Sequence, residues 1–70
     1  MNKNKKKVKV VETGMRFTPS DGEYEGIWHE VDYLIGDKGT VWDCKYEGKF
    51  GMNWAFDEAD ILRWINEVNH

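Results

Sequence analysis

The sequence has 70 residues, a net charge of −3, and 40% hydrophobic and 33% charged side chains, which indicates one small soluble domain and excludes a multidomain enzyme. Four Trp, three Tyr and three Phe supply a core, because each buried aromatic ring removes about 150–250 Å² from water. The single cysteine, Cys44, excludes an internal disulfide and a cysteine-based zinc cage. No apolar run approaches the roughly 20 residues of a membrane span or resembles a signal peptide, so we expect a cytoplasmic protein with no membrane partner.

Charge divides the chain into a basic tail, residues 1–7, and a single acidic domain, residues 8–70. The tail carries four lysines and no acid, whereas the domain carries six basic and thirteen acidic side chains, a net charge of −7. A polar lysine-rich tail has nothing to pack and should be mobile in water. Such a tail serves as a solubilising end or as a loose contact for phosphates or an acidic partner.

The first half of the chain predicts a strand, a loop and a second strand. Residues 8–17 contain β-branched residues around Gly14, which favours a first strand with a bulge or turn. Residues 18–26 contain Pro19, Ser20 and two glycines and are typical of a loop. Residues 27–35 predict a half-buried strand with one face formed by His29, Val31, Tyr33 and Ile35.

The second half predicts a meander followed by a helix. Residues 41–46 alternate with period two and follow a turn at 36–39, and a hairpin connection at 47–49 leads into a strand over 50–56. Ile61, Trp64 and Ile65 then follow helical spacing, with Asp57 as N-cap, which predicts a helix over 58–69 packed on the sheet. The expected fold class is α+β: a small twisted antiparallel sheet, or an SH3-like half-barrel, of three to five strands packed by one C-terminal helix.

Catalytic and metal-binding motifs are incomplete, so we expect neither an enzyme nor a cofactor. His29 and Glu30 begin like a zinc-protease motif, but Tyr33 stands where its second histidine is needed and the segment predicts a strand; such a histidine is more often a surface hydrogen-bonding group. Residues 21–32 align in part with a calcium loop, yet an acidic solvated loop explains them better. Cys44 alternates in phase with the aromatic residues beside it, which predicts a small core residue and not a nucleophile.

The remaining feature is a concentration of acids beside aromatic residues between the loop and the central strand. Aromatic residues with few rotamers make good interface anchors, and neighbouring carboxylates steer a basic partner and pair with its arginines. An acidic protein also carries acidic side chains over its whole solvent-exposed surface. The simpler interpretation of this concentration of acids is therefore an ordinary solvated surface. The candidate partner-binding residues are Glu23, Tyr24, Glu25, Trp28, Glu30 and Asp32.

Two resemblances extend this interpretation. Residues 36–41, and later Trp54 to Phe56 with Asp60 to Leu62, resemble the turn, strand and helical turn of SH3-like small β-barrel proteins, although this chain ends in a full helix where a barrel adds a strand. A short acidic chain with a lysine-rich start also looks like small accessory proteins of bacteriophages. That resemblance implies an inhibitor that binds a basic, nucleic-acid-interacting host protein and occludes its site, in some cases by imitating DNA.

Three functions therefore stand as alternatives. The first is a non-enzymatic acidic protein-binding module for a basic host protein. The second is a small nucleic-acid-binding β-barrel that uses the lysine-rich tail for phosphates and exposed Trp28 or Trp42 for base stacking. The third is a structural subunit that self-associates, as a homodimer for example, through an exposed sheet edge.

Overall fold

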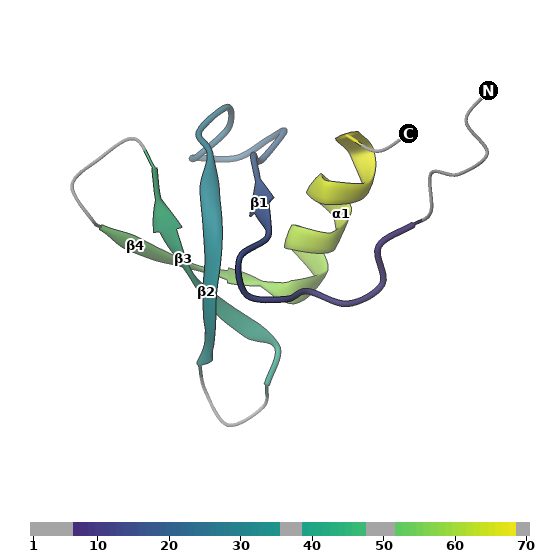
Figure 1. Ribbon diagram of the computed structural model, residues 1–70. Coiled ribbons are helices and arrows are strands. Elements are labelled where there is room, and N and C mark those ends of the chain that lie inside the picture. Colours follow the sequence, from purple (N-terminus) through teal and green to yellow (C-terminus); the bar gives the residue numbers. More distant parts are fainter. Residues whose placement is uncertain (1–6, 36–38, 48–51, 69–70) are drawn as a thin grey trace.

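Four antiparallel strands and one C-terminal helix form the fold, which confirms the predicted α+β class (Figure 1). The computed structural model describes residues 7–35, 39–47 and 52–68. The sheet order is β1-β2-β3-β4, so sequential strands are neighbours throughout. The elements are β1 (Arg16–Phe17), β2 (His29–Ile35), β3 (Val41–Tyr46), β4 (Asn53–Asp57) and α1 (Glu58–Val68).

The first strand is shorter than predicted: β1 covers Arg16–Phe17 alone, and the prediction of a strand from residue 8 is wrong. A turn interrupts it, in which the Met15 N–H donates to the Glu12 carbonyl over 3.2 Å and Gly14 has a φ of 96°, a region that side chains disfavour. The segment before the turn runs beside α1 (Figure 1). The Asn66 amide accepts from the Val8 N–H at 2.7 Å and donates to the Val8 carbonyl at 3.0 Å. A helix side chain therefore takes the place of a neighbouring strand.

A β-bulge in β2 reverses the predicted alternation of its second half. Val31 pairs with Cys44 and Tyr33 pairs with Asp43, so Asp32 is an extra residue between two consecutive partners. One extra residue moves every later side chain to the other face. Tyr33, predicted to share a face with Val31, is consequently 54% exposed on the opposite face of the sheet.

The end of the chain follows the prediction more closely. β3 has the predicted bounds, and α1 begins directly after Asp57, the predicted N-cap. β4 covers Asn53–Asp57, and residues 50 and 51 of the predicted strand lie outside the described residues. The Glu58 N–H donates to the Thr40 carbonyl over 2.7 Å, which ties the first residue of α1 to the start of β3. Of the predicted features, the lysine-rich tail up to residue 6, most of the 36–39 turn and most of the hairpin connection lie outside the described residues.

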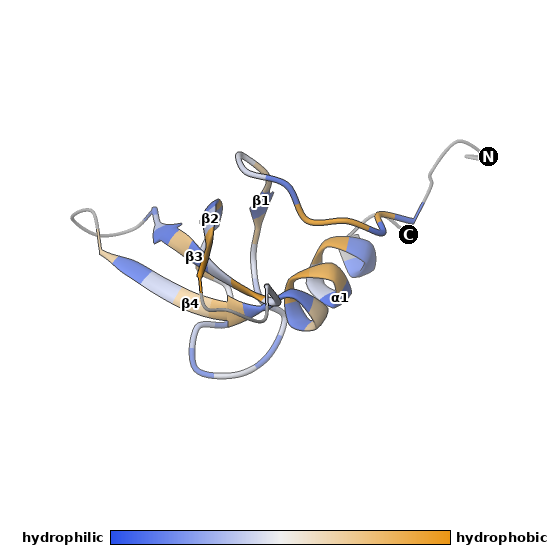
Figure 2. Ribbon diagram, turned by 90° about the horizontal axis from the view of Figure 1, so that it is seen from below, coloured by the Kyte–Doolittle hydropathy of each residue, from blue (hydrophilic) through white to orange (hydrophobic). Residues whose placement is uncertain are grey.

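The core lies between the curled sheet and α1, as the helical spacing predicts. Trp64 of α1 stacks on Phe17 of β1 at 5.9 Å and meets Phe56 of β4 edge-on at 5.5 Å, while Phe17 and Phe56 are themselves 5.4 Å apart. The rings of the two edge strands thus meet beneath the helix. Figure 2 shows apolar positions of α1 interleaved with polar ones, and no helix of the described segments is long and apolar enough to cross a membrane.

Candidate functional site

Between β1 and β2, residues 18–28 form a loop with a defined shape. The Gly26 N–H donates to the Pro19 carbonyl over 2.9 Å, which closes the loop at its base. Inside it, the Ile27 N–H donates to the Tyr24 carbonyl over 3.2 Å. Gly22 and Gly26 adopt φ values of 88° and 81°, where a Cβ atom would be strained. This backbone positions four of the six candidate residues, Glu23, Tyr24, Glu25 and Trp28.

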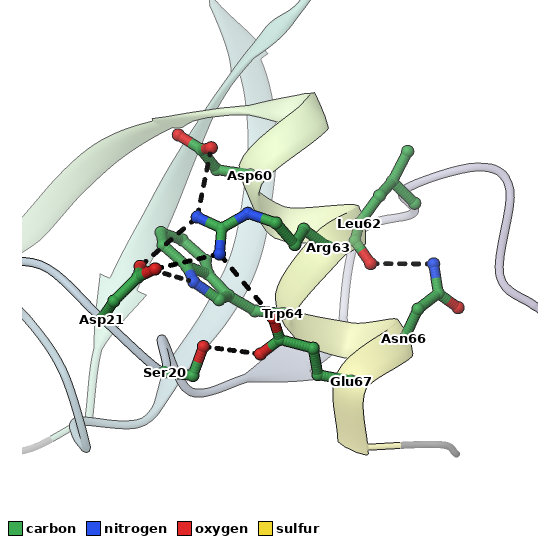
Figure 3. Close-up of polar contacts among 8 residues, drawn as sticks. All are labelled: Ser20, Asp21, Asp60, Leu62, Arg63, Trp64, Asn66 and Glu67. Atoms are coloured by element: carbon green, nitrogen blue, oxygen red, sulfur yellow. Dashed lines mark hydrogen bonds and ion pairs between the residues drawn. The ribbon is translucent and has the colours of Figure 1, made fainter.

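Asp21 attaches this loop to α1 (Figure 3). Its carboxylate accepts hydrogen bonds from Arg63 at 3.0 Å and from the Trp64 indole N–H at 3.1 Å. These two donors lower the pKa of the Asp21 carboxyl, with the Arg63 contribution larger. The Ser20 hydroxyl adds a hydrogen bond to Glu67 one turn further along α1. Asp21, which opens the calcium-loop alignment, is therefore held by a guanidinium and an indole of the helix.

Tyr24 points from the loop into the core. Its ring lies 4.8 Å from the Trp54 ring and contacts Phe56 and His29 edge-on at 5.8 and 6.1 Å. Removal from water raises the pKa of the Tyr24 phenol. Glu23 and Glu25, on either side, are exposed, and neither forms an ion pair with the described residues. Because the Tyr24 side chain points inward, the neighbouring Glu23 and Glu25 side chains point into solvent.

Trp28 lies on the other face of the sheet, under a guanidinium. It is 43% exposed, and the Arg16 guanidinium lies 5.1 Å from its ring centre. The Arg16 Nε and Nη2 atoms donate to the two oxygens of the Glu47 carboxylate, at 2.9 and 2.8 Å. This pairing lowers the pKa of the Glu47 carboxyl. The Glu47 N–H also donates to the Trp28 carbonyl over 3.0 Å. Arg16 of β1 and Glu47, which directly follows β3, therefore fix the position of Trp28.

Glu30 and Asp32 lie further along β2 and separate at the bulge. Glu30 is half-buried and pairs in register with Arg16 on one side and Lys45 on the other, so it lies close to Trp28. Asp32 is half-buried at the bulge, where its carbonyl accepts from the Thr13 hydroxyl at 2.8 Å. The structure thus brings Trp28 and Glu30 together, places Glu23 and Glu25 on the adjoining loop, directs Tyr24 inward and leaves Asp32 at the bulge.

Sequence reasoning missed Arg16 and Glu47. They are separated by 31 residues, and only the pairing of β1 with β2 and of β2 with β3 places them together. Neither residue belongs to a local motif. The one available signal is that each is a charged residue next to the end of a predicted strand.

His29 is a core residue, and its expected role as a surface hydrogen-bonding group is wrong. It is fully buried, with its ring stacked between Phe17 at 5.4 Å and Tyr46 at 5.5 Å. Burial lowers the pKa of the imidazole, so the neutral ring donates from Nδ1 to the Ile27 carbonyl at 2.9 Å. Nε2 has no hydrogen-bond partner among the described residues. Within those residues, no three His, Cys, Asp or Glu side chains lie close enough to hold a metal ion.

Cys44 and Trp42 are also interior. Cys44 is fully buried, as predicted, and burial raises the pKa of its thiol to about 12, so at neutral pH the nucleophilic thiolate is scarce. Trp42, considered for base stacking, is buried as well, and its indole N–H donates to Glu58 at 3.2 Å. Trp42 is therefore unavailable as a stacking surface. Of the two tryptophans considered for stacking, Trp28 alone presents its ring to solvent.

Comparison with known proteins adds no assignment. The chain matches no protein-family model, and searches of curated proteins and of solved structures return no match. The resemblances to SH3-like barrels and to bacteriophage accessory proteins stay predictions. The exposed tryptophan and the carboxylates beside it and on the adjoining loop are therefore the features that indicate a function.

Proposed function

We propose that this protein is a non-enzymatic, acidic protein-binding module that covers a basic surface of a partner protein. The observation that carries the proposal is Trp28, which is 43% exposed, whereas the other three tryptophans belong to the core cluster or pack against it. Glu30 lies beside it, and the exposed Glu23 and Glu25 extend the carboxylates along the loop. We name Glu23, Glu25, Trp28 and Glu30 the acidic Trp28 surface.

Charge supplies the steering in this proposal. Acidic side chains outnumber basic ones on the described surface, and both described arginines are already held in ion pairs. A partner rich in Lys and Arg is attracted over a distance of about one Debye length, roughly 8 Å at physiological salt. On contact, its arginines pair with the free carboxylates and pack against the uncovered part of the Trp28 ring.

Occlusion is the proposed mode of action. Spaced carboxylates on a rigid surface imitate the charge of a phosphate backbone, so the favoured partner is a nucleic-acid-interacting host protein in the cytoplasm, as a phage-encoded inhibitor would meet it. We also propose that the curled sheet is an SH3-like half-barrel, because Phe17 and Phe56 of the two edge strands meet at 5.4 Å. In that arrangement the acidic Trp28 surface lies outside the half-barrel.

The double variant Glu23→Lys/Glu25→Lys tests the proposal. The wild-type protein is used as bait in the native host, captured proteins are identified by mass spectrometry, and the association rate with the purified partner is measured at several salt concentrations. We expect the double variant to associate at least about tenfold more slowly at low salt, with an unchanged thermal midpoint. Equal association by the double variant would remove the proposal.

A matched control separates local recognition from net charge. Glu12→Lys makes the same charge change as Glu25→Lys, at an exposed residue of the segment before β1. If the acidic Trp28 surface makes the contact, Glu25→Lys slows association much more than Glu12→Lys. Equal effects of the two variants would indicate nonspecific attraction.

The exposure of Trp28, Lys7 and Lys9 favours one second candidate, a single-strand nucleic-acid binder. A single-stranded oligonucleotide that quenches Trp28 fluorescence, with binding lost on deletion of residues 1–7, would support that function. The protein-binding proposal expects the same deletion to leave partner binding nearly intact.

A further inference from the structure

β4 is an edge strand with one unpaired side. The bonds from the Tyr46 N–H to the Met52 carbonyl (2.9 Å) and from the Glu58 N–H to the Thr40 carbonyl (2.7 Å) set the phase of the β3–β4 ladder. Ladder bonds recur at every second residue, so Trp54 and Phe56 use their backbone groups toward β3. The N–H groups of Asn53, Ala55 and Asp57 point away from the sheet, and no backbone hydrogen bond from the described loops satisfies them.

β4 carries few of the features that protect an edge strand. Proteins commonly shorten an edge strand, bend it with a bulge, or place Lys or Pro on it. The opposite edge strand, β1, is two residues long. β4 instead pairs with β3 without a register shift over five residues, and contains neither Lys, Arg nor Pro. Its outer-face residues Asn53, Ala55 and Asp57 are all exposed.

We propose that β4 pairs antiparallel with β4 of a second copy of this chain, about a twofold axis at Ala55. In this register Ala55 faces Ala55 of the second copy, and Asn53 faces Asp57 of the second copy at both ends. Two small side chains meet at the axis, and no two carboxylates are directly opposed. Such self-complementarity is what a symmetric interface requires.

Side-chain chemistry favours a second copy over an unrelated strand. The Asn53 amide already donates one N–H to the Asp43 carboxylate, which leaves its second N–H for Asp57 of the second copy. On the inner face, the half-buried Trp54 lies next to Phe56 of the second copy. The result is one continuous eight-stranded sheet, with β2, which carries Glu30 and follows Trp28, two strands away from the new junction in each copy.

Charge variants at Asn53 provide the sharpest test, by sedimentation equilibrium of the full chain over a range of concentrations. Asn53→Asp sets two carboxylates opposite each other at both ends, and we expect it to weaken the dimer about three- to tenfold. Asn53→Lys sets a cation opposite Asp57 and should strengthen the dimer by a similar factor. Effects of the same sign in both variants would overturn the proposed register.

Ala55→Pro tests the backbone pairing itself. Proline removes an outward N–H that β3 does not use, so we expect a folded monomer, whereas Ala55→Ser keeps the N–H and should keep the dimer. Circular dichroism and thermal unfolding establish that each variant is folded. A wild-type chain that stays monomeric at millimolar concentration, or a folded Ala55→Pro variant that still dimerises, would overturn the proposal.

The dependence on salt concentration distinguishes this dimer from the proposed binding to a basic partner. Both copies are acidic, so added salt screens their repulsion and should strengthen the dimer, whereas it should weaken binding to a basic partner. Each proposal can therefore fail while the other stands.

Discussion

Tyr24 and Trp28 stand four residues apart in one loop, and the structure uses them in opposite ways. Tyr24 turns inward against Trp54, Phe56 and His29, whereas Trp28 remains 43% exposed beneath Arg16. Each has a glutamate as a close neighbour in the sequence. Local composition therefore does not distinguish an aromatic residue that holds the fold from one that is available to a partner.

The difference arises from what each ring meets. Tyr24 meets the rings of Trp54, Phe56 and His29, so it packs against the core cluster. Trp28 directly precedes His29, whose side chain occupies the inner face, so alternation directs Trp28 outward.

Trp64→Ala should have the largest effect on stability. Trp64 is 6% exposed and contacts Phe17, Phe56 and Asp21, so its removal leaves a cavity among three elements. We expect a loss of about 3–5 kcal/mol in the free energy of unfolding, measured by urea denaturation. An unchanged denaturation midpoint would mean that α1 does not pack through this ring.

Tyr24→Ala should be destabilising by about 2 kcal/mol, because a half-buried ring loses only part of its burial. Besides the denaturation midpoint, hydrogen exchange should report faster exchange at the Ile27 N–H, which donates to the Tyr24 carbonyl. Tyr24→Phe keeps the ring and should restore both quantities. If Tyr24→Ala were as stable as the wild type, Tyr24 would be a surface residue, as Trp28 is, and not part of the core.

His29 should make stability fall as the pH is lowered from 7 to 5. Burial lowers the pKa of the folded imidazole below the value of about 6.5 in the unfolded chain, so between these two pKa values the unfolded chain binds a proton that the folded protein excludes. The free energy of unfolding then decreases by up to about 1.4 kcal/mol per pH unit. Of the titratable groups near the ring, the Tyr24 phenol has a raised pKa and is uncharged over this range, and the Glu47 charge opposes the shift only in part.

A pair of histidine variants isolates that dependence. His29→Phe keeps an aromatic ring and should remove the slope between pH 7 and 5, whereas His70→Gln removes the other histidine and should retain it. Asp21 and Glu47, whose pKa values are lowered, lose their contributions only below about pH 4.5, outside this range. If the stability of His29→Phe still depended on pH in this range, the dependence would belong to another group.

Trp28→Ala should have the smallest effect on stability and a large effect on binding. The contact with Arg16 is exposed, so we expect a loss of about 0.5–1 kcal/mol in the free energy of unfolding. Partner binding should fall by much more, because an exposed aromatic anchor is a typical hot spot. Retained binding in Trp28→Ala would move the interface away from the acidic Trp28 surface.

Prediction from the sequence succeeded where a local repeat decides the structure. The bounds of β3 and the burial of Cys44 follow from period-two alternation, and the inward face of α1 follows from the spacing of Ile61 and Trp64. For the candidate site, the sequence identified Trp28 and its acidic neighbours. It did not identify Arg16 and Glu47, which orient Trp28 from distant parts of the chain.

The sequence by itself therefore determined the class of fold, because alternation and helical spacing are properties of neighbouring residues. Only the tertiary structure decided that Asn66 captures Val8, that a bulge at Asp32 turns Tyr33 outward and that His29 lies between Phe17 and Tyr46. Each of these outcomes depends on a partner far along the chain. Such a partner becomes available only when the sheet has curled against α1, and no local pattern encodes it.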